Sequence, residues 1–267
     1  MEKLTILGTG AAMVTKCYNT CFTISDYEEH FLIDAGGGNT ILSHLEKSNI
    51  SINQIHNMFI SHNHNDHILG AIWIIRAVAQ NIINKKYEGN FNIYCHETSI
   101  DALKTISSFV LNKKFTKYFD DRIIFIPIED GYKTNILGRN TTFFDIRSNK
   151  DLQFGFKTTL LNEKTLTFLG DEPYRESLVS YADIVDYLLH EAYCLYEHAT
   201  IFKPYDKHHV TVKDACENAK NLNVKSVILY HTEDKNLDRR KEFYLKEGQS
   251  IFNGEIYVPY DLEIIEL

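Results

Sequence analysis

The most restrictive feature of this 267-residue sequence is a short segment rich in metal-ligand side chains. Its pattern, H-x-H-x-D-H, is formed by His62, His64, Asp66 and His67. Imidazole nitrogen and carboxylate oxygen are the ligands that zinc and neighbouring transition metals prefer in proteins. Such a density of ligand groups suits neither an ordinary core nor an ordinary surface. We therefore interpret the segment as a metal-binding motif.

The motif lies between a predicted strand and a predicted helix. The apolar run at residues 58–60 before it indicates a short buried strand over residues 58–61, and the pattern after it indicates a helix from Asp66 to about Lys85. In α/β proteins with open sheets, loops at the carboxyl ends of the strands carry the chemistry. The motif thus occupies a loop in which we expect a functional site.

The rest of the chain alternates between short apolar runs, typical of strands, and amphipathic segments, typical of helices. We predict strands at residues 3–8, 21–25, 30–34, 91–95, 123–126, 141–146, 154–161, 165–169 and 227–230, and helices near 41–45, 97–112, 212–222 and 237–246. The second and third strands should form a hairpin around residues 26–29. No repeat or Pro/Gly-rich linker occurs, which predicts a single domain over residues 1–267. Two mixed sheets face to face with helices outside, a four-layer α/β sandwich, would bury the apolar runs.

The charge balance argues against long nucleic acid as a partner. The formal net charge is -8, whereas proteins that grip nucleic acid through its phosphates usually carry a basic excess or a clear basic patch. The nearest candidate patch, at residues 113–117, is better explained as a solvated helix end. A small phosphorylated substrate held at a metal is compatible with an acidic protein, and we prefer that partner to nucleic acid.

Composition also bounds the expected location of the protein. No stretch reaches the roughly 18 to 20 apolar residues of a membrane span, and the N-terminus lacks the features of a signal peptide. Five cysteines, an odd number in a chain without such a signal, are interpreted as reduced thiols. We therefore expect a cytoplasmic protein with no membrane partner.

Three further strand ends carry groups of the same chemical kind. Asp171, the pair His190-Glu191 and His231 each follow a short apolar run. A side chain directly after a buried strand is held rigidly, as a ligand must be at about 2.0–2.2 Å from a metal. Each has an ordinary alternative explanation, such as a turn cap for Asp171. Together with the dense motif, they predict convergence on one metal site.

This set of residues resembles the pattern of the metallo-β-lactamase superfamily. The dense motif, Gly170-Asp171 and the strand-end His231 match that pattern, as do Gly8-Thr9-Gly10 and Asp34-Ala35-Gly36. The resemblance covers nearly the whole chain. It implies the four-layer sandwich of that fold, with two mixed sheets face to face.

Within the superfamily, the chain is most similar to the ribonuclease Z branch and related phosphodiesterases. His190-Glu191-Ala192-Tyr193 is similar to that branch's His-Glu-Ala-Thr signature. Residues 207–211, followed by Ala215, are similar to its His-Ser-Thr segment, which opens a helix. The first motif is highly specific, and these two are moderately specific.

The resemblance implies a site for one or two divalent ions, Zn²⁺ in the first place and Mn²⁺ as an alternative. The ligands that it implies are His62, His64, Asp66, His67, Asp171 and His231. The first two would bind one ion, the aspartate at 171 would bridge two ions, and the remaining three would bind the second.

The resemblance also implies three catalytic residues. Asp66 would orient the attacking water. His209 would donate a hydrogen bond or a proton to the phosphate or the leaving oxygen, and Glu191 would hold His209 in the useful tautomer. We prefer His209 to its neighbour His208 because its spacing to Thr211 fits the family pattern.

Two departures from the family pattern limit the resemblance. The family's third histidine for the first metal is missing, and its expected position falls near Asn149, a poor neutral ligand. The neighbouring Lys150 would either repel an ion or contact substrate phosphate. The tRNA-gripping arm of ribonuclease Z is also missing, because two predicted strands with a turn at 162–164 fill the space before Asp171. These departures weaken the first metal site and argue against tRNA 3′ processing.

The predicted function is therefore a metal-dependent hydrolase, a phosphodiesterase acting on a small or cyclic phosphodiester or nucleotide. The alternatives are a ribonuclease Z-type RNA-processing nuclease, a thioester or lactone hydrolase of the same fold, and a non-catalytic metal-binding scaffold. The missing third histidine supports the scaffold. An enzyme is supported by the coherent set of remaining residues, Asp66, His67, Asp171, Glu191, His209 and His231. We expect a homodimer, although no motif in the sequence determines the oligomeric state.

Four aromatic residues have two possible roles each. Tyr193, Tyr196, Phe202 and Tyr205 lie close in sequence to the predicted catalytic residues, where they either line a ring-binding face or pack in the core. Core packing is the commoner role of such side chains, and we expect it here. Trp73, on an apolar helix face, is also expected in the core.

Overall fold

The structure is a computed structural model that describes residues 2–26 and 28–267. The chain forms two compact units, each built from separate stretches of sequence. The first unit comprises Met1–Gly8, Tyr18–Glu129 and Asp261–Leu267, and the second comprises Thr9–Cys17 and Asp130–Tyr260. The prediction of a single domain over residues 1–267 stays a prediction.

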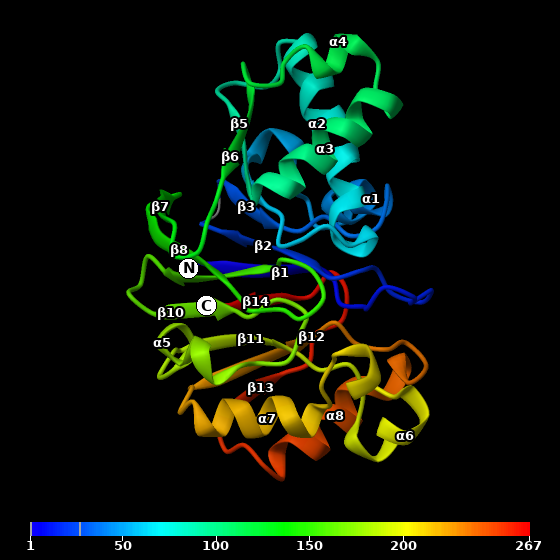
Figure 1. Ribbon diagram of the computed structural model, residues 1–267, viewed down its shortest axis with the longest axis vertical. Coiled ribbons are helices and arrows are strands. Elements are labelled where there is room, and N and C mark those ends of the chain that lie inside the picture. The colour runs from blue at the N-terminus through cyan, green and yellow to red at the C-terminus, as the bar shows by residue number, and fades with distance from the viewer. Residues whose placement is uncertain (1, 27) are drawn as a thin grey trace. The chain divides into compact units, whose positions relative to one another are not determined.

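The first unit contains a seven-stranded mixed sheet in the order β14-β1-β2-β3-β4-β5-β6 (Figure 1). The pairs from β14 to β3 are antiparallel, and the pairs from β3 to β6 are parallel. The strands are β1 (Lys3–Gly8), β2 (Cys21–Ser25), β3 (His30–Ile33), β4 (Ile55–Phe59), β5 (Phe91–Cys95), β6 (Ile123–Pro127) and β14 (Ile264–Glu266). In the parallel half, β3 is followed by Asp34 and β4 leads into the histidine motif.

Four helices belong to the first unit, and α2 forms the largest part of its helical core. The helices are α1 (Thr40–Lys47), α2 (Asn65–Ile83), α3 (Glu97–Val110) and α4 (Lys113–Thr116), with a 3-10 turn η1 (Ile52–Gln54). Ile74 and Ile75 of α2 are buried together with Met58 of β4 and Ile93 of β5. Removing these apolar side chains from water stabilises the unit and fixes α2 against its sheet.

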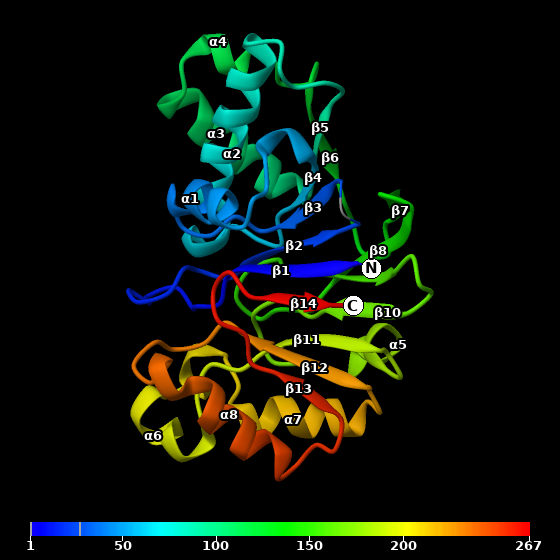
Figure 2. The same cartoon turned by 180° about the vertical axis from the view of Figure 1, so that it is seen from behind.

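The second unit contains another seven-stranded mixed sheet, in the order β13-β12-β11-β10-β9-β8-β7 (Figure 1, and from behind in Figure 2). Strands β10, β11, β12 and β13 pair in parallel, and β7, β8, β9 and β10 pair antiparallel. The strands are β7 (Lys133–Ile136), β8 (Arg139–Asp145), β9 (Phe154–Thr159), β10 (Thr165–Phe168), β11 (Tyr187–Glu191), β12 (Ser226–Tyr230) and β13 (Glu255–Tyr257).

The helices of the second unit pack on this sheet chiefly through α7 and α8. They are α5 (Val179–Ala182), α6 (Ala199–Phe202), α7 (Val212–Asn221) and α8 (Arg240–Gln249), with 3-10 turns η2 (Glu176–Leu178), η3 (Tyr196–His198), η4 (Tyr205–Lys207) and η5 (Leu237–Arg239). Ala215 and Ala219 of α7 share a buried cluster with Leu229 of β12 and Tyr244 of α8. The small alanines allow α7 to approach the sheet closely, so the strand ends beside it are firmly held.

The predicted strands and helices are present, several with shifted ends. The hairpin of β2 and β3 is confirmed by their antiparallel pairing, whereas Tyr27 of its predicted turn lies outside the described residues. The apolar run before His190-Glu191 is strand only in part, because β11 begins at Tyr187. Ile184 instead has a left-handed backbone (φ 57°) and is 69% exposed. The sequence did not predict β7, because its residues are largely polar and exposed.

No helix of the described residues has the length and apolar content that a membrane crossing requires.

The connection between Asn149 and Asp171 was predicted to consist of two strands joined by a short turn, and this is confirmed. Strands β9 and β10 fill this connection as an antiparallel pair, and the turn between them closes with a hydrogen bond from the Leu160 amide to the Lys164 carbonyl.

Candidate active site

The histidine motif forms a compact group in the first unit. The residues lie in the loop after β4 and in the first turn of α2, which begins at Asn65. The ring centroids of His62 and His64 are 4.4 Å apart, and those of His62 and His67 are 4.2 Å apart. Asp66 is buried, and its Oδ2 lies 3.4 Å from Nε2 of His67. Three imidazoles and a carboxylate thus converge within one unit, as the sequence pattern predicts.

Asp34 positions two of these imidazoles. Its Oδ2 accepts a hydrogen bond from Nδ1 of His67 at 2.8 Å and another from the Ser61 hydroxyl at 2.7 Å. Because the Ser61 proton is used in this way, the Ser61 oxygen must accept from Nδ1 of His62, which lies 3.0 Å away. Both imidazoles therefore carry their proton on Nδ1 and present Nε2 as the basic nitrogen, as metal-binding histidines do.

The backbone at Asp34 supports this role. Asp34 follows β3 in a left-handed conformation (φ 53°), which is uncommon outside glycine, and it is 1% exposed. Its Oδ1 accepts a further hydrogen bond from the Ser61 amide at 2.8 Å. From the sequence, Asp34 was noted only in the segment Asp34-Ala35-Gly36 that matches the superfamily pattern, and its contact with the histidines was not predicted. Its position directly after a buried apolar strand was the available signal, the same signal that led us to Asp171.

The second unit brings together Asp171, Glu191 and His231, which follow or end the parallel strands β10, β11 and β12. All three side chains are buried. His231 Nε2 lies 3.5 Å from Asp171 Oδ2, and its Nδ1 lies 3.8 Å from Glu191 Oε2. The predicted residues from distant parts of the sequence are therefore neighbours within this unit, because the carboxyl ends of parallel strands meet at one edge of a sheet.

His209 joins this group from the loop before α7. Its Nδ1 lies 2.8 Å from Glu191 Oε2 and 3.0 Å from the Asp171 carbonyl oxygen. A carbonyl oxygen only accepts, so Nδ1 carries the proton and Nε2 is the nitrogen that can act on a substrate. Glu191 also accepts a hydrogen bond from the Val210 amide at 3.1 Å, which fixes the loop. His208, the competing neighbour, is exposed.

The electrostatics of this pair follow from burial. Burial raises the pKa of Glu191 to about 8, against the opposing effect of the nearby His231. Burial also lowers the pKa of His209, and the charge of Lys150 acts in the same direction. The neighbouring His190 is fully buried and has a pKa lowered to about 4 by that burial. His190 donates from Nδ1 to the Glu191 carbonyl at 2.8 Å, and its Nε2 accepts from Asn218 at 3.1 Å, so its role is structural.

The loop that lacks the third histidine has a different arrangement. Asn149 and Lys150 are both exposed. The Ser148 hydroxyl donates to Glu172 at 2.8 Å and accepts from the Lys150 amide at 3.0 Å. These contacts hold the loop next to the residue that follows Asp171. Where the family pattern has a histidine, this loop therefore carries no imidazole, and the charge of the adjacent Lys150 acts on His209.

The donor chemistry of both units fits a divalent metal ion. The first unit supplies imidazoles whose Nδ1 atoms are occupied by oxygen acceptors, and the second supplies a buried aspartate and a buried imidazole. Glu191, His209 and His231 also have ligand atoms within 4.8 Å of one another. In this last group, Glu191 and His209 also contact each other directly, with Oε2 and Nδ1 2.8 Å apart.

Comparisons with known proteins agree with the fold and with the resemblance. The profile of the family described as "Anti-Pycsar protein Apyc1" matches residues 2–251. A curated relative, ribonuclease Z from Thermococcus sibiricus, is 25% identical, and the alignment covers 100% of this chain and 97% of that protein.

Two solved structures show the same fold at low sequence identity. The metallo-β-lactamase fold protein YhfI from Bacillus subtilis has a TM-score of 0.80 and 17% identity, and the match covers 99% of this chain and 98% of YhfI. A diphosphatase of the PhnP family has a TM-score of 0.76 and 16% identity, over 100% of this chain and 98% of that one. The predicted α/β metallo-β-lactamase fold is confirmed.

Proposed function

This chain belongs to the anti-Pycsar protein Apyc1 family, and from that premise we propose that it is a phosphodiesterase for a small or cyclic phosphodiester or nucleotide. The chain is a metal-dependent hydrolase of the metallo-β-lactamase fold. The observation that supports phosphodiester chemistry best is the pair of His209 and Glu191, 2.8 Å apart. This pair supplies a proton donor for a leaving oxygen, which the hydrolysis of a thioester does not need.

We propose that six side chains act together on one or two divalent ions. They are His62, His64, Asp66, His67, Asp171 and His231. Zn²⁺ suits this donor set, and Mn²⁺ is the alternative. When bound, the ion makes water nucleophilic near pH 7 and stabilises the charge that develops on the phosphate oxygens. The poor ligand at Asn149 makes the site for the first ion the weaker of the two.

The chain's own residues then handle the protons. Asp66 accepts a hydrogen bond from the attacking water and orients it toward phosphorus. As the new P–O bond forms and the bond to the leaving oxygen breaks, His209 passes its Nε2 proton to that oxygen. Buried Glu191 accepts the hydrogen bond from Nδ1 and so fixes the direction of Nε2. The positive charge of Lys150 acts on His209, and we propose that this ammonium group binds a phosphate oxygen.

A ribonuclease Z-type nuclease is the second candidate, because a relative with that name aligns over the whole chain. Against it stand the net charge of -8 and the direct β9–β10 hairpin, which leaves no tRNA-gripping arm. Two further alternatives, a thioester or lactone hydrolase and a non-catalytic metal-binding scaffold, are separated from the proposal by activity and by metal content.

The discriminating assay compares two substrates. Zinc- and manganese-loaded protein should hydrolyse bis-p-nitrophenyl phosphate in preference to a thioester. Preference for the thioester would reverse the ranking, and faster cleavage of a tRNA precursor than of small phosphodiesters would favour the nuclease. Retention of either metal without hydrolysis of any of these substrates would favour the scaffold.

We also propose a homodimer in the cytoplasm. No disulfide joins the five cysteines, which suits a reducing compartment.

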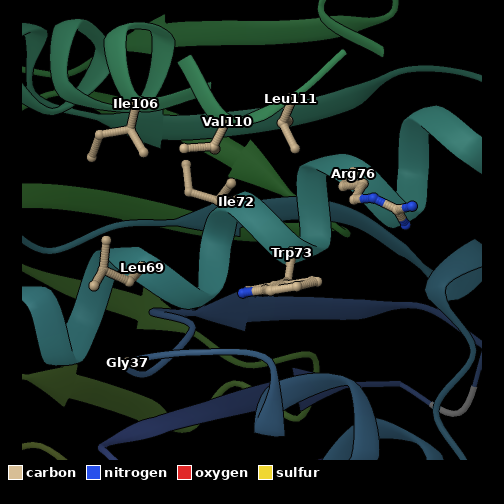
Figure 3. A pocket seen from close by; sticks show the side chains of 8 residues that line it. All are labelled: Gly37, Leu69, Ile72, Trp73, Arg76, Ile106, Val110 and Leu111. Atoms are coloured by element: carbon tan, nitrogen blue, oxygen red, sulfur yellow. The ribbon is translucent and has the colours of Figure 1, made fainter. Parts of the chain in front are cut away.

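A groove of about 370 Å³ between α2 and α3 is lined mainly by apolar residues, and Figure 3 shows Ile72 and Val110 pointing toward each other across it. Trp73, expected in the core, lines this groove and is 40% exposed, so that expectation is wrong. Val110→Asp should reduce the mass measured by analytical ultracentrifugation from that of a dimer to that of a monomer. An unchanged dimer would place the interface elsewhere.

A further inference from the structure

Helix α8 of the second unit carries three polar side chains on one face. Arg240, Tyr244 and Glu247 follow one another at intervals of four and three residues, so they lie on the same side of the helix. Arg240 and Tyr244 are fully buried, and Glu247 is half-buried. We refer to these three residues as the polar face of α8. The function proposed above gives none of them a role.

Close packing fixes α8 in place. The helix contacts α7 and β13 (Figure 2). A Cβ atom on Gly248 would lie 2.8 Å from the Ile256 side chain of β13 and 2.9 Å from the Cys216 sulfur of α7, which is closer than Cβ atoms normally approach. The glycine therefore allows the helix to lie directly against both elements. Side chains that extend from α8 start from a firmly held backbone.

Arg240 binds the turn that carries His231. Its guanidinium donates to the Thr232 hydroxyl, to the Thr9 hydroxyl at 3.1 Å and to the Pro259 carbonyl at 2.6 Å. Thr232 directly follows His231, and its amide donates to the Thr9 carbonyl at 3.0 Å. The side chain of Arg240 thus ties the turn after β12 to two other segments of the same unit.

The backbone of this turn needs such support. His231 has a left-handed conformation (φ 56°), which is uncommon outside glycine and persists only where the surroundings enforce it. A buried positive charge is costly to leave without hydrogen bonds, so the guanidinium keeps its acceptors. The direction of the His231 ring therefore depends on the contacts of Arg240.

Glu247 binds both ends of the segment that carries His209. Its carboxylate accepts a hydrogen bond from the Tyr196 amide, which lies 3.1 Å and 3.2 Å from its two oxygens. It also accepts from the amide of Lys213, the second residue of α7, at 3.0 Å. These two amides enclose residues 197–212, and His209 is among them. One carboxylate on α8 thus joins the beginning and the end of this segment.

The segment has little apolar packing of its own. Of residues 196–208, Pro204 alone is buried. The aromatic residues of this region that were expected in the core are half-buried or exposed, so that expectation is wrong. They are Tyr193, Tyr196, Phe202 and Tyr205. A segment with so few buried apolar contacts depends on polar contacts at its ends to stay in one conformation.

Tyr193 adds a second link between α8 and His209. Its carbonyl oxygen accepts a hydrogen bond from the Tyr244 hydroxyl at 3.1 Å, and its amide donates to the Val210 carbonyl at 2.9 Å. The Tyr193 ring stacks on the His209 ring, with centroids 5.2 Å apart and planes inclined by 19°. Tyr193 and Phe202 also line a pocket of about 280 Å³. The middle residue of the polar face therefore holds the residue on which His209 stacks.

We propose that the polar face of α8 positions the two functional histidines of the second unit independently. Arg240 sets the direction of the His231 ring and thereby the zinc affinity. Glu247, assisted by Tyr244, holds the His209 segment and thereby sets the rate of hydrolysis. This inference rests on the roles proposed above for the two histidines. All three residues act through other residues and are positioning residues.

Zinc titration tests the role of Arg240. Arg240→Met should weaken zinc binding by about 10–100-fold, as the loss of a group that orients a metal ligand typically does. Thr232→Val leaves the arginine in place and removes one of its acceptors. It should weaken zinc binding by a smaller factor, and it provides the test if Arg240→Met does not fold.

Arg139→Met is the matched control for this titration. Arg139 is also buried (1% exposed), and its guanidinium donates to the Leu137 carbonyl in the turn between β7 and β8. The control should lower stability and leave the zinc affinity of the folded protein unchanged. Equal zinc affinities in Arg240→Met and Arg139→Met, or an unchanged affinity in Thr232→Val, would overturn the role of Arg240.

Steady-state kinetics tests the role of Glu247. Glu247→Leu should lower kcat for bis-p-nitrophenyl phosphate by about 10–100-fold, because the proton donor is no longer held in place, and should leave zinc affinity unchanged. Glu247→Gln keeps an oxygen acceptor and should keep kcat within about threefold of the unaltered protein. Glu242→Leu, at an exposed position of the same helix, should change neither quantity. An unchanged kcat in Glu247→Leu, or a loss of zinc affinity equal to that of Arg240→Met, would contradict independent positioning.

Hydrogen exchange measured by mass spectrometry gives a readout that does not depend on the proposed function. Glu247→Leu should accelerate exchange in residues 196–213, and Arg240→Met should accelerate it in residues 9–11 and 230–233. Each variant should leave the segments of the other unchanged. Localised exchange in a protein that hydrolyses no phosphodiester would support positioning by α8 and contradict the proposed function. Uniformly faster exchange across the second unit in both variants would overturn positioning by α8.

Discussion

The two units of the molecule each contain a buried carboxylate that holds one imidazole by its Nδ1 atom. In the first unit, Asp34 lies 2.8 Å from Nδ1 of His67, and in the second, Glu191 lies 2.8 Å from Nδ1 of His209. The local geometry is the same, but the surroundings differ. Asp34 and His67 belong to a group of three imidazoles, whereas Glu191 and His209 lie next to an aromatic pocket and a lysine.

This difference indicates that the same pairing of a buried carboxylate with an imidazole can serve two functions. A carboxylate on Nδ1 makes Nε2 more basic and fixes its direction, which serves a metal ligand and a proton donor equally well. The residues around each pair determine whether its imidazole acts as a metal ligand or as a proton donor. We infer that Asp34 acts on metal affinity and that Glu191 acts on proton transfer, and the following predictions test that division from the largest expected effect to the smallest.

Loss of the His209 ring should have the largest effect. His209→Ala should lower kcat for bis-p-nitrophenyl phosphate by about 10²–10⁴-fold, because the leaving oxygen loses its proton donor. Zinc content should remain that of the unaltered protein. His208→Ala is the control on the adjacent, exposed residue and should leave kcat within about twofold. A comparable loss in both variants would show that the loop, and not the His209 ring, is responsible.

Acid should destabilise the protein through buried histidines outside the two pairs. Burial lowers the pKa of His30, in β3 of the first unit, to about 4. In the unfolded chain a histidine titrates near 6.5. Between these pH values the unfolded state binds a proton that the folded state rejects, so stability is full above about pH 6.5 and falls as the pH drops toward 4.

The His30→Gln variant isolates this effect. Denaturant unfolding at pH 7 and pH 4.5 should show that the unaltered protein loses about 2–3 kcal/mol more than the variant over that interval. His190 of the second unit, with its pKa also lowered to about 4, should contribute a similar acid sensitivity that His30→Gln leaves in place. Parallel stability curves for the two proteins would show that His30 is not the titrating group.

Conservative changes of the two carboxylates should have the smallest effect and separate the units most clearly. Asp34→Asn should weaken zinc binding by about 10–100-fold, as the loss of a group that orients a metal ligand typically does. Glu191→Gln should leave zinc affinity unchanged and lower kcat by a factor of about ten. Zinc titration and steady-state kinetics give a zinc affinity and a kcat for each of the two variants. If both variants change the same quantity, the proposed division between the units is wrong.

The two regions also differ in how much the sequence predicts. The motif at residues 62–67 is local, so its ligand chemistry is visible as a pattern of spacing, and the strand and helix around it were predicted from apolar periodicity. The pair of Glu191 and His209 is separated in sequence and could be assigned only through the family resemblance. Its contact depends on the loop before α7, which is held against the end of β11 by the hydrogen bond from the Tyr193 amide to the Val210 carbonyl, and spacing alone does not encode this contact.

Other features were not predictable because they depend on packing. The role of Asp34 requires β3 and β4 to be adjacent, so that its carboxylate reaches both Ser61 and His67. The exposure of Trp73 and the placement of Tyr193 in a pocket depend on which faces of their elements other segments cover. Periodicity identifies an apolar or aromatic side chain, but it does not show whether a partner surface is present.

The central claim of this account is that the first and the second unit each supply ligands for divalent metal ions. The most direct test is a zinc-binding titration of His67→Ala, from the first unit, and His231→Ala, from the second, with His209→Ala as the reference. We predict that both ligand variants lose tight zinc binding and that His209→Ala retains it. Unchanged zinc affinity in His231→Ala, or equal loss in all three variants, would contradict the claim.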